Sequence, residues 1–353
     1  MRNKVVAIAL SALVGGALMA PVTGATADTS GALREYVVYY GEDASLSDAR
    51  TAIEAAGGRV VDELTSIGVA KVVSRDASFR SNVLDESALA GAARNQIIGY
   101  SDPARRDKID EVESLSAAKA AGHNATVQAA VDAEPLADLQ WDMDMIHATS
   151  DGSHAVQPGD PRVRVGIIDT GIDASHPDIA PNFDAALSRN FTTDIELVDG
   201  PCNQEPDRSC SDPNNVDEAG HGTHVAGTVG AAVNGLGIAG IAPEVTLVNL
   251  RAGQDSGFFF LFETLAAYTY AADNGIDVVN MSFYTDPWLY NCRDNPLDSP
   301  EDQAEQATII DSSNRALNYA YSQGVTLIGA AGNSHTDLGD PTYDASSPDF
   351  PPG

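Results

Sequence analysis

The stretch that most constrains the fold is a seven-residue segment in the middle of the chain, His-Gly-Thr-His-Val-Ala-Gly at 221–227. A histidine stands before small residues, and apolar residues then recur at helical spacing, so we predict a helix that begins at His221. Glycine at 222 and 227 removes Cβ at two points, which allows another backbone and a packed helix to come close. A histidine at such an open edge, with an ordinary pKa of about 6.5, is suited to accept a proton.

Two other segments end in polar residues where strands are expected to end. Residues 162–168 form a strand-length run that closes on Asp169-Thr170-Gly171, and a second run, 324–332, closes on Asn333. The first run is typical of a buried parallel strand, and the second is predicted to be a further strand that ends in a turn of small residues. Reactive groups gather beyond the carboxyl ends of such strands, so Asp169 and His221 can meet there. An aspartate that accepts the Nδ1 proton of a histidine fixes its tautomer, and an asparagine amide can donate to a developing oxyanion.

The order Asp169, His221, Asn333 resembles that of the subtilisin-like serine proteases, and the resemblance covers roughly residues 135–353. It implies an α/β fold with a parallel sheet flanked by helices, and hydrolysis of proteins or peptides by an Asp-His-Ser triad that requires no cofactor. Under this resemblance Asp169 orients the histidine, His221 is the general base, and Asn333 donates to the tetrahedral intermediate.

The same resemblance assigns substrate-binding residues and exposes one departure from the family. Residues 278–282 look like its substrate-lining strand, so Ser282, Ala331 and Gly332 are expected to contact substrate. The Gly-Thr-Ser-Met-Ala segment that carries the nucleophile is absent, and we expect the serine beyond residue 353. The chain alone would then be inactive, because triad members act as a unit. The competing hypothesis is a non-enzymatic relative, or an inhibitor or binding module built on residues 33–100.

An aspartic protease is a weaker alternative. The Asp-Thr-Gly triplet at 169–171 and the Asp-Ser-Gly triplet at 255–257 could suggest a carboxylate dyad. Pepsin-like folds, however, are all β, whereas the strands expected here alternate with helices such as 261–273 and 303–321. The alternation favours the serine protease hypothesis.

Residues 1–27 have the pattern of a signal peptide. Two basic residues precede an apolar run at 5–19, and Ala25-Thr26-Ala27 offers a cleavage site before Asp28. The apolar run is shorter than a stable membrane span needs. We therefore expect a secreted protein whose mature chain starts at or downstream of Asp28.

Residues 28–100 are expected to form a small α+β domain. The predicted elements are strands at 35–40, 59–64, 67–73 and 96–100, with helices at 47–56 and 86–94. This βαββαβ order resembles the subtilisin propeptide, an intramolecular inhibitor and folding aid, although many small domains share it. The charged, alanine-rich residues 101–134 are expected to be a linker to a partial catalytic domain at 135–353.

The three cysteines fit an exported protein. Cys202 and Cys210 lie in one polar loop, where we predict a local disulfide. Cys292 is left over, and we expect its partner outside the 353 residues.

Charge and metal preference complete the expectations. The chain has 51 acidic and 20 basic residues, a formal charge of -31, which argues against nucleic acid or an anionic membrane as a partner. We expect a monomer.

Calcium prefers oxygen ligands, and the resemblance implies a structural calcium site formed by Asp178, Asn234 and loop carbonyls. The alternative is a helix-capping aspartate and a turn asparagine.

Overall fold

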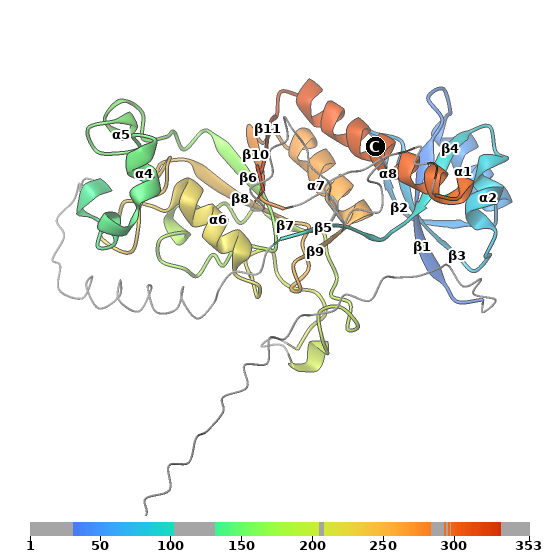
Figure 1. Ribbon diagram of the computed structural model, residues 1–353, viewed down its shortest axis with the longest axis horizontal. Coiled ribbons are helices and arrows are strands. Elements are labelled where there is room, and N and C mark those ends of the chain that lie inside the picture. Colours follow the sequence, from blue (N-terminus) through green and yellow to red (C-terminus); the bar gives the residue numbers. More distant parts are fainter. Residues whose placement is uncertain are drawn as a thin grey trace, which may run out of the picture.

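The computed structural model describes residues 31–101, 131–204, 208–283, 293, 296 and 298–332. The predicted signal peptide, most of the predicted linker, Cys292 and Asn333 lie outside these residues. Figure 1 shows an antiparallel sheet near one end of the molecule, a parallel sheet towards the other end, and helices between them. Among the described residues, none of the helices is both long and apolar enough to cross a membrane.

The N-terminal unit is a four-stranded antiparallel sheet in the order β2-β3-β1-β4. Its side chains alternate between two buried faces, as the two-residue period of a strand requires. Tyr36 and Val38 of β1 pack against the unit's own helices, whereas Val37 packs into a second core shared with the rest of the molecule. The elements are β1 (Arg34–Tyr40), α1 (Leu46–Ala55), β2 (Arg59–Leu64), β3 (Val69–Ser74), α2 (Phe79–Leu84) and β4 (Leu89–Arg94).

The helix predicted at 86–94 is wrong, because that segment is strand β4 and the helix α2 precedes it. Alanine favours a helix in isolation, but β4 pairs with β1, and its small residues let helix α8 (Pro300–Ser322) lie directly on it. A Cβ at Gly91 would overlap the hydroxyl of Thr308. The predicted strand at 96–100 does form, as β5 (Ile97–Tyr100), but it leaves this sheet and pairs with β9 (Phe258–Phe260).

The parallel sheet has the order β11-β10-β6-β8-β7, and every neighbouring pair is parallel. The two faces of the sheet are covered by different helices. Helix α6 (His221–Gly230) packs against the face from which Ile167 projects, and helices α7 (Leu261–Asp273) and α8 pack against the opposite face, from which Ile168 projects. The predicted parallel sheet flanked by helices is therefore confirmed. Its strands are β6 (Arg164–Ile168), β7 (Arg189–Asn190), β8 (Thr246–Arg251), β10 (Val278–Met281) and β11 (Thr326–Gly329).

Short elements occupy the remaining described segments. They are η1 (Val131–Ala133), η2 (Ala137–Leu139), α4 (Trp141–Met145), α5 (Ser153–Val156), η3 (Ala180–Asn182) and η4 (Cys202–Gln204). The predicted disulfide between Cys202 and Cys210 is confirmed, and the two Cα atoms lie 5.1 Å apart. It closes the loop between β7 and α6.

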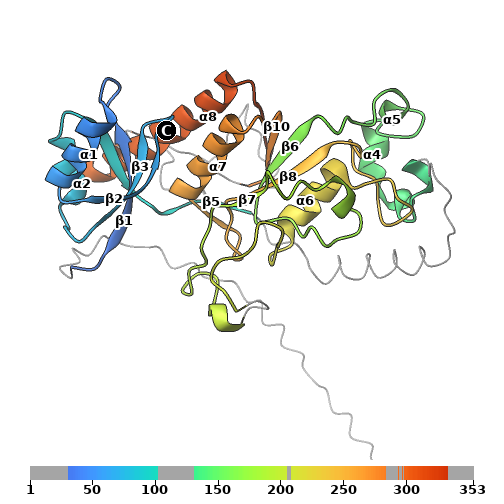
Figure 2. The same ribbon diagram turned by 180° about the vertical axis from the view of Figure 1, so that it is seen from behind.

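Helices α7 and α8 lie between the two sheets, as the views from both sides show (Figures 1 and 2). One continuous core joins Val37 and Ala93 of the N-terminal unit to Leu265 of α7 and Val279 of β10. Ion pairs surround this core, including Lys71 Nζ to Glu263 Oε1 at 2.8 Å. The N-terminal unit thus buries one sheet face against the helices of the parallel-sheet unit.

Candidate functional site

Asp169 and His221 lie in hydrogen-bonding contact at the carboxyl edge of the parallel sheet. Asp169 directly follows β6 and is fully buried, and His221 is the first residue of α6 with its side chain 19% exposed. Asp169 Oδ1 and His221 Nδ1 are 2.7 Å apart. Because an ionised carboxylate has no proton to give, Nδ1 is the donor, and Nε2 is the nitrogen that can accept a proton. The pair can therefore perform general-base chemistry.

Two glycines allow the strand end and the helix start to come this close. A Cβ at Gly222 would overlap the carbonyl oxygen of Gly171 and approach the Cβ of Asp169 to 3.0 Å. Gly171 has a φ of 142° and faces the carbonyl oxygen of Val216, so it could not carry a side chain either. Backbone contact at these two positions fixes the separation of Asp169 and His221.

Burial raises the pKa of Asp169 above that of an ordinary aspartate, while the hydrogen bond from His221 acts in the opposite direction. The backbone N–H of Thr170 also donates to Asp169 Oδ1, at 2.7 Å. The main chain is held as well, because the N–H groups of Ala252 and Gly253 donate to the carbonyl oxygen of Asp169 at 3.1 and 3.0 Å. Asp169 is thus fixed at both its side chain and its backbone.

The residues assigned to substrate binding follow β10, which pairs with β6, and β11, which pairs with β10. Because β6, β10 and β11 are adjacent and parallel, their carboxyl ends meet at one edge of the sheet. Ser282 follows β10, and its Oγ accepts a hydrogen bond from Asn280 Nδ2 at 2.8 Å. Ala331 and Gly332 follow β11 and are exposed. Asn333, the expected oxyanion donor, lies outside the described residues.

Asp178 and Asn234, predicted from the resemblance to hold calcium, lie close together. Asn234 Nδ2 donates to the carbonyl oxygen of Pro177, the residue before Asp178, at 3.1 Å, and Asp178 Oδ2 accepts the N–H of Ile238 at 3.3 Å. The structure adds a residue that sequence reasoning missed, Glu134, whose Oε1 accepts the backbone N–H of Gly235 at 3.0 Å. We call Glu134, Asp178 and Asn234 the Asp178 site.

The carboxylates of the Asp178 site are buried and incompletely satisfied. Asp178 Oδ1 and Glu134 Oε2 are buried without a hydrogen-bond partner among the described residues. Burial raises the pKa of both groups, and a protonated His176 would oppose this effect at Asp178. Two buried carboxylate oxygens without donors, beside an asparagine, suit a hard cation such as calcium.

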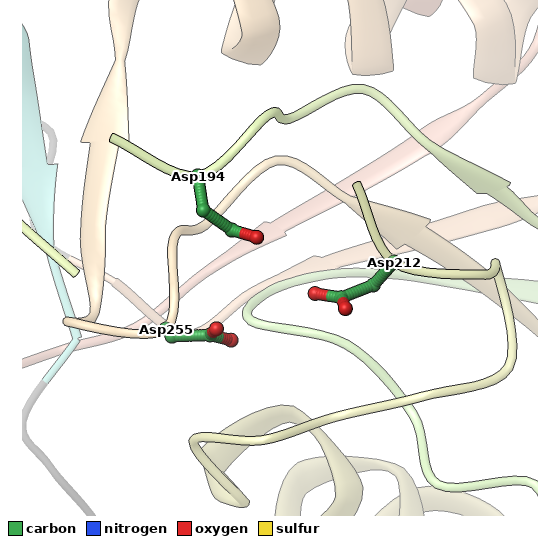
Figure 3. Close-up of side chains that lie close together, drawn as sticks. All are labelled: Asp194, Asp212 and Asp255. Atoms are coloured by element: carbon green, nitrogen blue, oxygen red, sulfur yellow. The ribbon is translucent and has the colours of Figure 1, made fainter. Parts of the chain in front are cut away.

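A second group of carboxylates surrounds Arg251, at the end of β8. Figure 3 shows Asp194, Asp212 and Asp255 pointing toward one another, and one carboxylate oxygen from each lies within 4.8 Å of the others. The buried guanidinium of Arg251 pairs with all three, at 2.6 Å to Asp212, 2.8 Å to Asp255 and 3.5 Å to Asp194. We call these four residues the Arg251 cluster. Because an arginine already serves as their counter-ion, we interpret it as a buried ion-pair network.

The comparisons with known proteins agree with the geometry. The profile of the subtilase family (peptidase family S8) matches residues 160–349, more than half of the chain. Subtilisin DY of Bacillus licheniformis is 33% identical over 172 residues, 49% of this chain and 47% of that protein. The nisin leader peptide-processing serine protease NisP of Lactococcus lactis is 28% identical over 280 residues, 78% of this chain and 38% of that protein. The chain thus spans about half or less of the length of these relatives.

Solved structures share the fold. The epidermin leader peptide processing serine protease EpiP of Staphylococcus aureus has a TM-score of 0.60 at 20% identity, over 88% of this chain and 62% of that chain. Fervidolysin of Fervidobacterium pennivorans, described as a keratinolytic enzyme related to subtilisin, has a TM-score of 0.52 at 21% identity, over 87% of this chain and 40% of that chain. The family profile, together with the parallel sheet and the contact between strand-end aspartate and helix-start histidine, supports one conclusion: the chain belongs to the subtilase family of serine proteases.

Proposed function

We propose that the chain is part of a secreted serine endopeptidase in which Asp169 and His221 are two members of the triad. The observation that carries the proposal is the 2.7 Å contact between Asp169 Oδ1 and His221 Nδ1. Asp169 holds the imidazole in the tautomer whose Nε2 takes the proton of the attacking serine, and it stabilises the imidazolium that forms. The proposal assigns the serine to sequence beyond residue 353.

The neighbouring strand ends supply the rest of the proposed site. Ser282 follows β10, and Ala331 and Gly332 follow β11, the next two strands of the sheet after β6. An extended peptide can contact them there, and Asn333 would donate to the oxyanion of the tetrahedral intermediate. Proteins and peptides are the proposed substrates.

The N-terminal unit is proposed to be an inhibitory propeptide. It packs on α7 and α8, and its last described strand, β5, pairs antiparallel with β9. The carbonyl oxygen of Gly257 accepts the N–H of Ser101 at 2.9 Å, so the chain leaves β5 beside the segment that follows β8. Since the N–H of Gly253 in that segment donates to the carbonyl oxygen of Asp169, this path brings the N-terminal unit close to the dyad and supports the proposed inhibition.

Labelling with a serine-directed fluorophosphonate tests the proposed function. We expect no labelling of this chain and labelling of the chain extended by its native downstream sequence. In the extended protein, His221→Ala should slow labelling by several orders of magnitude, because the serine loses its base. His224→Ala, an exposed position one turn further along the same helix, is the matched control and should label normally.

Two results would contradict the proposal. If neither protein is labelled, the non-enzymatic hypothesis gains support. If His221→Ala is labelled as fast as its control, the assignment of the base is wrong. N-terminal sequencing of exported protein tests secretion separately: a first residue at or after Asp28 is expected, and an intact Met1 would contradict it.

We also propose that the Asp178 site holds a structural calcium ion. Asp178, Asn234 and Glu134 would be ligands, and the ion would neutralise two buried carboxylates. The ion would contribute to stability by joining the segment around Glu134 to the loop after α6. Two hydrogen bonds already join them: the N–H of Gly235 donates to Glu134 Oε1, and the N–H of Leu136 donates to the carbonyl oxygen of Gly237 at 2.9 Å.

A further inference from the structure

Asp217 lies four residues before His221 and accepts four hydrogen bonds. Its Oδ1 accepts the N–H of Gly220 at 2.9 Å and the hydroxyl of Thr170 at 3.0 Å. Its Oδ2 accepts the N–H of Thr223 at 2.9 Å and the hydroxyl of Thr223 at 2.6 Å. Both carboxylate oxygens are therefore committed to the turn after β6 and to the first turn of α6.

The two threonines extend these bonds into a closed network around the dyad. Thr170 follows Asp169 directly, and its Oγ1 accepts the N–H of Gly222, the residue after His221, at 3.0 Å. Thr223 Oγ1 accepts the N–H of Asp173 at 2.9 Å. The carboxylate of Asp217 thus connects the segment that carries the aspartate to the segment that carries the histidine.

The N-terminus of α6 depends on this carboxylate because it has no cap of its own. Its N-cap residue, Gly220, has a φ of 86° and no side chain to accept a backbone N–H. The first N–H groups of a helix need such acceptors, and a carboxylate is also favoured there by the helix dipole. Asp217 supplies this interaction from outside the helix, at the turn where His221 begins.

We propose that Asp217 is a positioning residue that holds His221 against Asp169, in addition to capping α6. The importance of this positioning for activity rests on the proposed function, but the contact itself is a property of the chain described here. The Nδ1–H of His221 sits in a 2.7 Å hydrogen bond to a fully buried carboxylate. A small displacement of the helix start would lengthen that bond and expose its proton to exchange with water.

The direct test is the low-field Nδ1–H resonance of His221, observed by ¹H–¹⁵N NMR on the full 353-residue chain. In Asp217→Asn one oxygen becomes an NH₂ group, which cannot accept from the donors that face it. We expect the Nδ1–H proton to exchange with water about tenfold faster, the equivalent of weakening one net hydrogen bond. Asp173→Asn is the matched control. It removes a carboxylate from the turn after β6, whose Oδ1 accepts hydrogen bonds from Ser175 and not from the network around Asp217, and it should leave exchange unchanged.

An unchanged Nδ1–H resonance and exchange rate in Asp217→Asn would overturn the proposal, even with a lower melting temperature, because Asp217 would then be a helix cap alone. Equal acceleration in the Asp173→Asn control would overturn it too. If Asp217→Asn does not fold, Thr223→Ala replaces it, since this variant keeps the carboxylate of Asp217 and removes only the hydroxyl that donates to Asp217 Oδ2 and accepts the N–H of Asp173. A threefold or larger acceleration there supports the proposal, and no acceleration contradicts it. Failure of the fluorophosphonate labelling would leave these NMR outcomes as they are, so the two proposals fail separately.

Discussion

The Arg251 cluster and the Asp178 site both contain buried carboxylates, but the two sites differ in what balances the negative charge. Each places carboxylates in the interior, where an unpaired charge is expensive. In the Arg251 cluster, three carboxylates converge on one guanidinium that is completely buried. In the Asp178 site, two carboxylates meet backbone N–H groups and an asparagine, and among the described residues no lysine or arginine pairs with them.

The difference indicates where an external cation is needed. The Arg251 cluster carries a counter-ion in the sequence, since the guanidinium of Arg251 pairs with all three carboxylates. In the Asp178 site, burial raises the pKa of Glu134 and of Asp178, and no lysine or arginine among the described residues pairs with them. The proximity of acidic side chains is thus a poor guide to a metal site unless the cation already present is considered.

The largest effect on stability is expected from removing the guanidinium of Arg251. Arg251→Met should lower the free energy of unfolding by about 3–5 kcal/mol, because buried carboxylates lose their partner. Urea unfolding of the full chain measures the loss. Arg162→Met, which breaks an exposed pair with Asp160, is the control and should leave the midpoint nearly unchanged. A loss no larger than in the control would mean that the Arg251 cluster is hydrated or rearranged.

A smaller effect is expected from supplying the external cation. Calcium at 100 times its dissociation constant should add about 2.7 kcal/mol to the free energy of unfolding, and EDTA should remove it. Thermal unfolding with and without calcium measures the difference. Asp178→Asn and Glu134→Gln should abolish the response, whereas Asp255→Asn in the Arg251 cluster should retain it. No response in the unmodified protein would remove calcium from the Asp178 site, and loss of the response in Asp255→Asn alone would move the ion to the Arg251 cluster.

The smallest effect concerns the excess carboxylate of the Arg251 cluster. Burial raises the pKa of Asp255, so its contribution to stability is present below its unfolded pKa of about 4 and declines as pH rises through the raised folded value. Asp255→Asn should therefore have a higher free energy of unfolding than the unmodified protein at neutral pH, and the same free energy of unfolding near pH 3. Urea unfolding at both pH values provides the measurement.

The matched control for this prediction is Asp160→Asn. Hydrogen bonds from Arg162 lower the pKa of Asp160 to about 2, the opposite direction, so the variant should show no gain at neutral pH. A loss of stability at neutral pH in Asp255→Asn would mean that the ion pair with Arg251 outweighs the burial of the carboxylate.

Local sequence patterns were sufficient to locate the dyad. The strand-end aspartate, the helix that begins at His221 and the bounds of α7 follow from apolar periodicity and small-residue spacing, which depend on neighbouring residues. The disulfide between Cys202 and Cys210 was predictable for the same reason, since the two cysteines lie in one loop. The apolar run before Asp169 indicated a buried parallel strand, and the likeness to a known family added the expectation of a sheet flanked by helices.

Long-range contacts determined what the sequence alone could not. Residues 89–94 became a strand because β1 pairs with them and α8 needs small side chains to pack there, and no pattern within the segment carries that information. Glu134 and Asp217 have partners that are distant in the sequence. Glu134 accepts the N–H of Gly235, and Asp217 accepts the hydroxyl of Thr170, so both contacts require the fold. Apolar periodicity reflects the local geometry of a helix or strand, whereas the partner of a carboxylate depends on how distant segments pack. The sequence was therefore sufficient to locate Asp169 and His221. Only the tertiary structure decided which residues hold them in place.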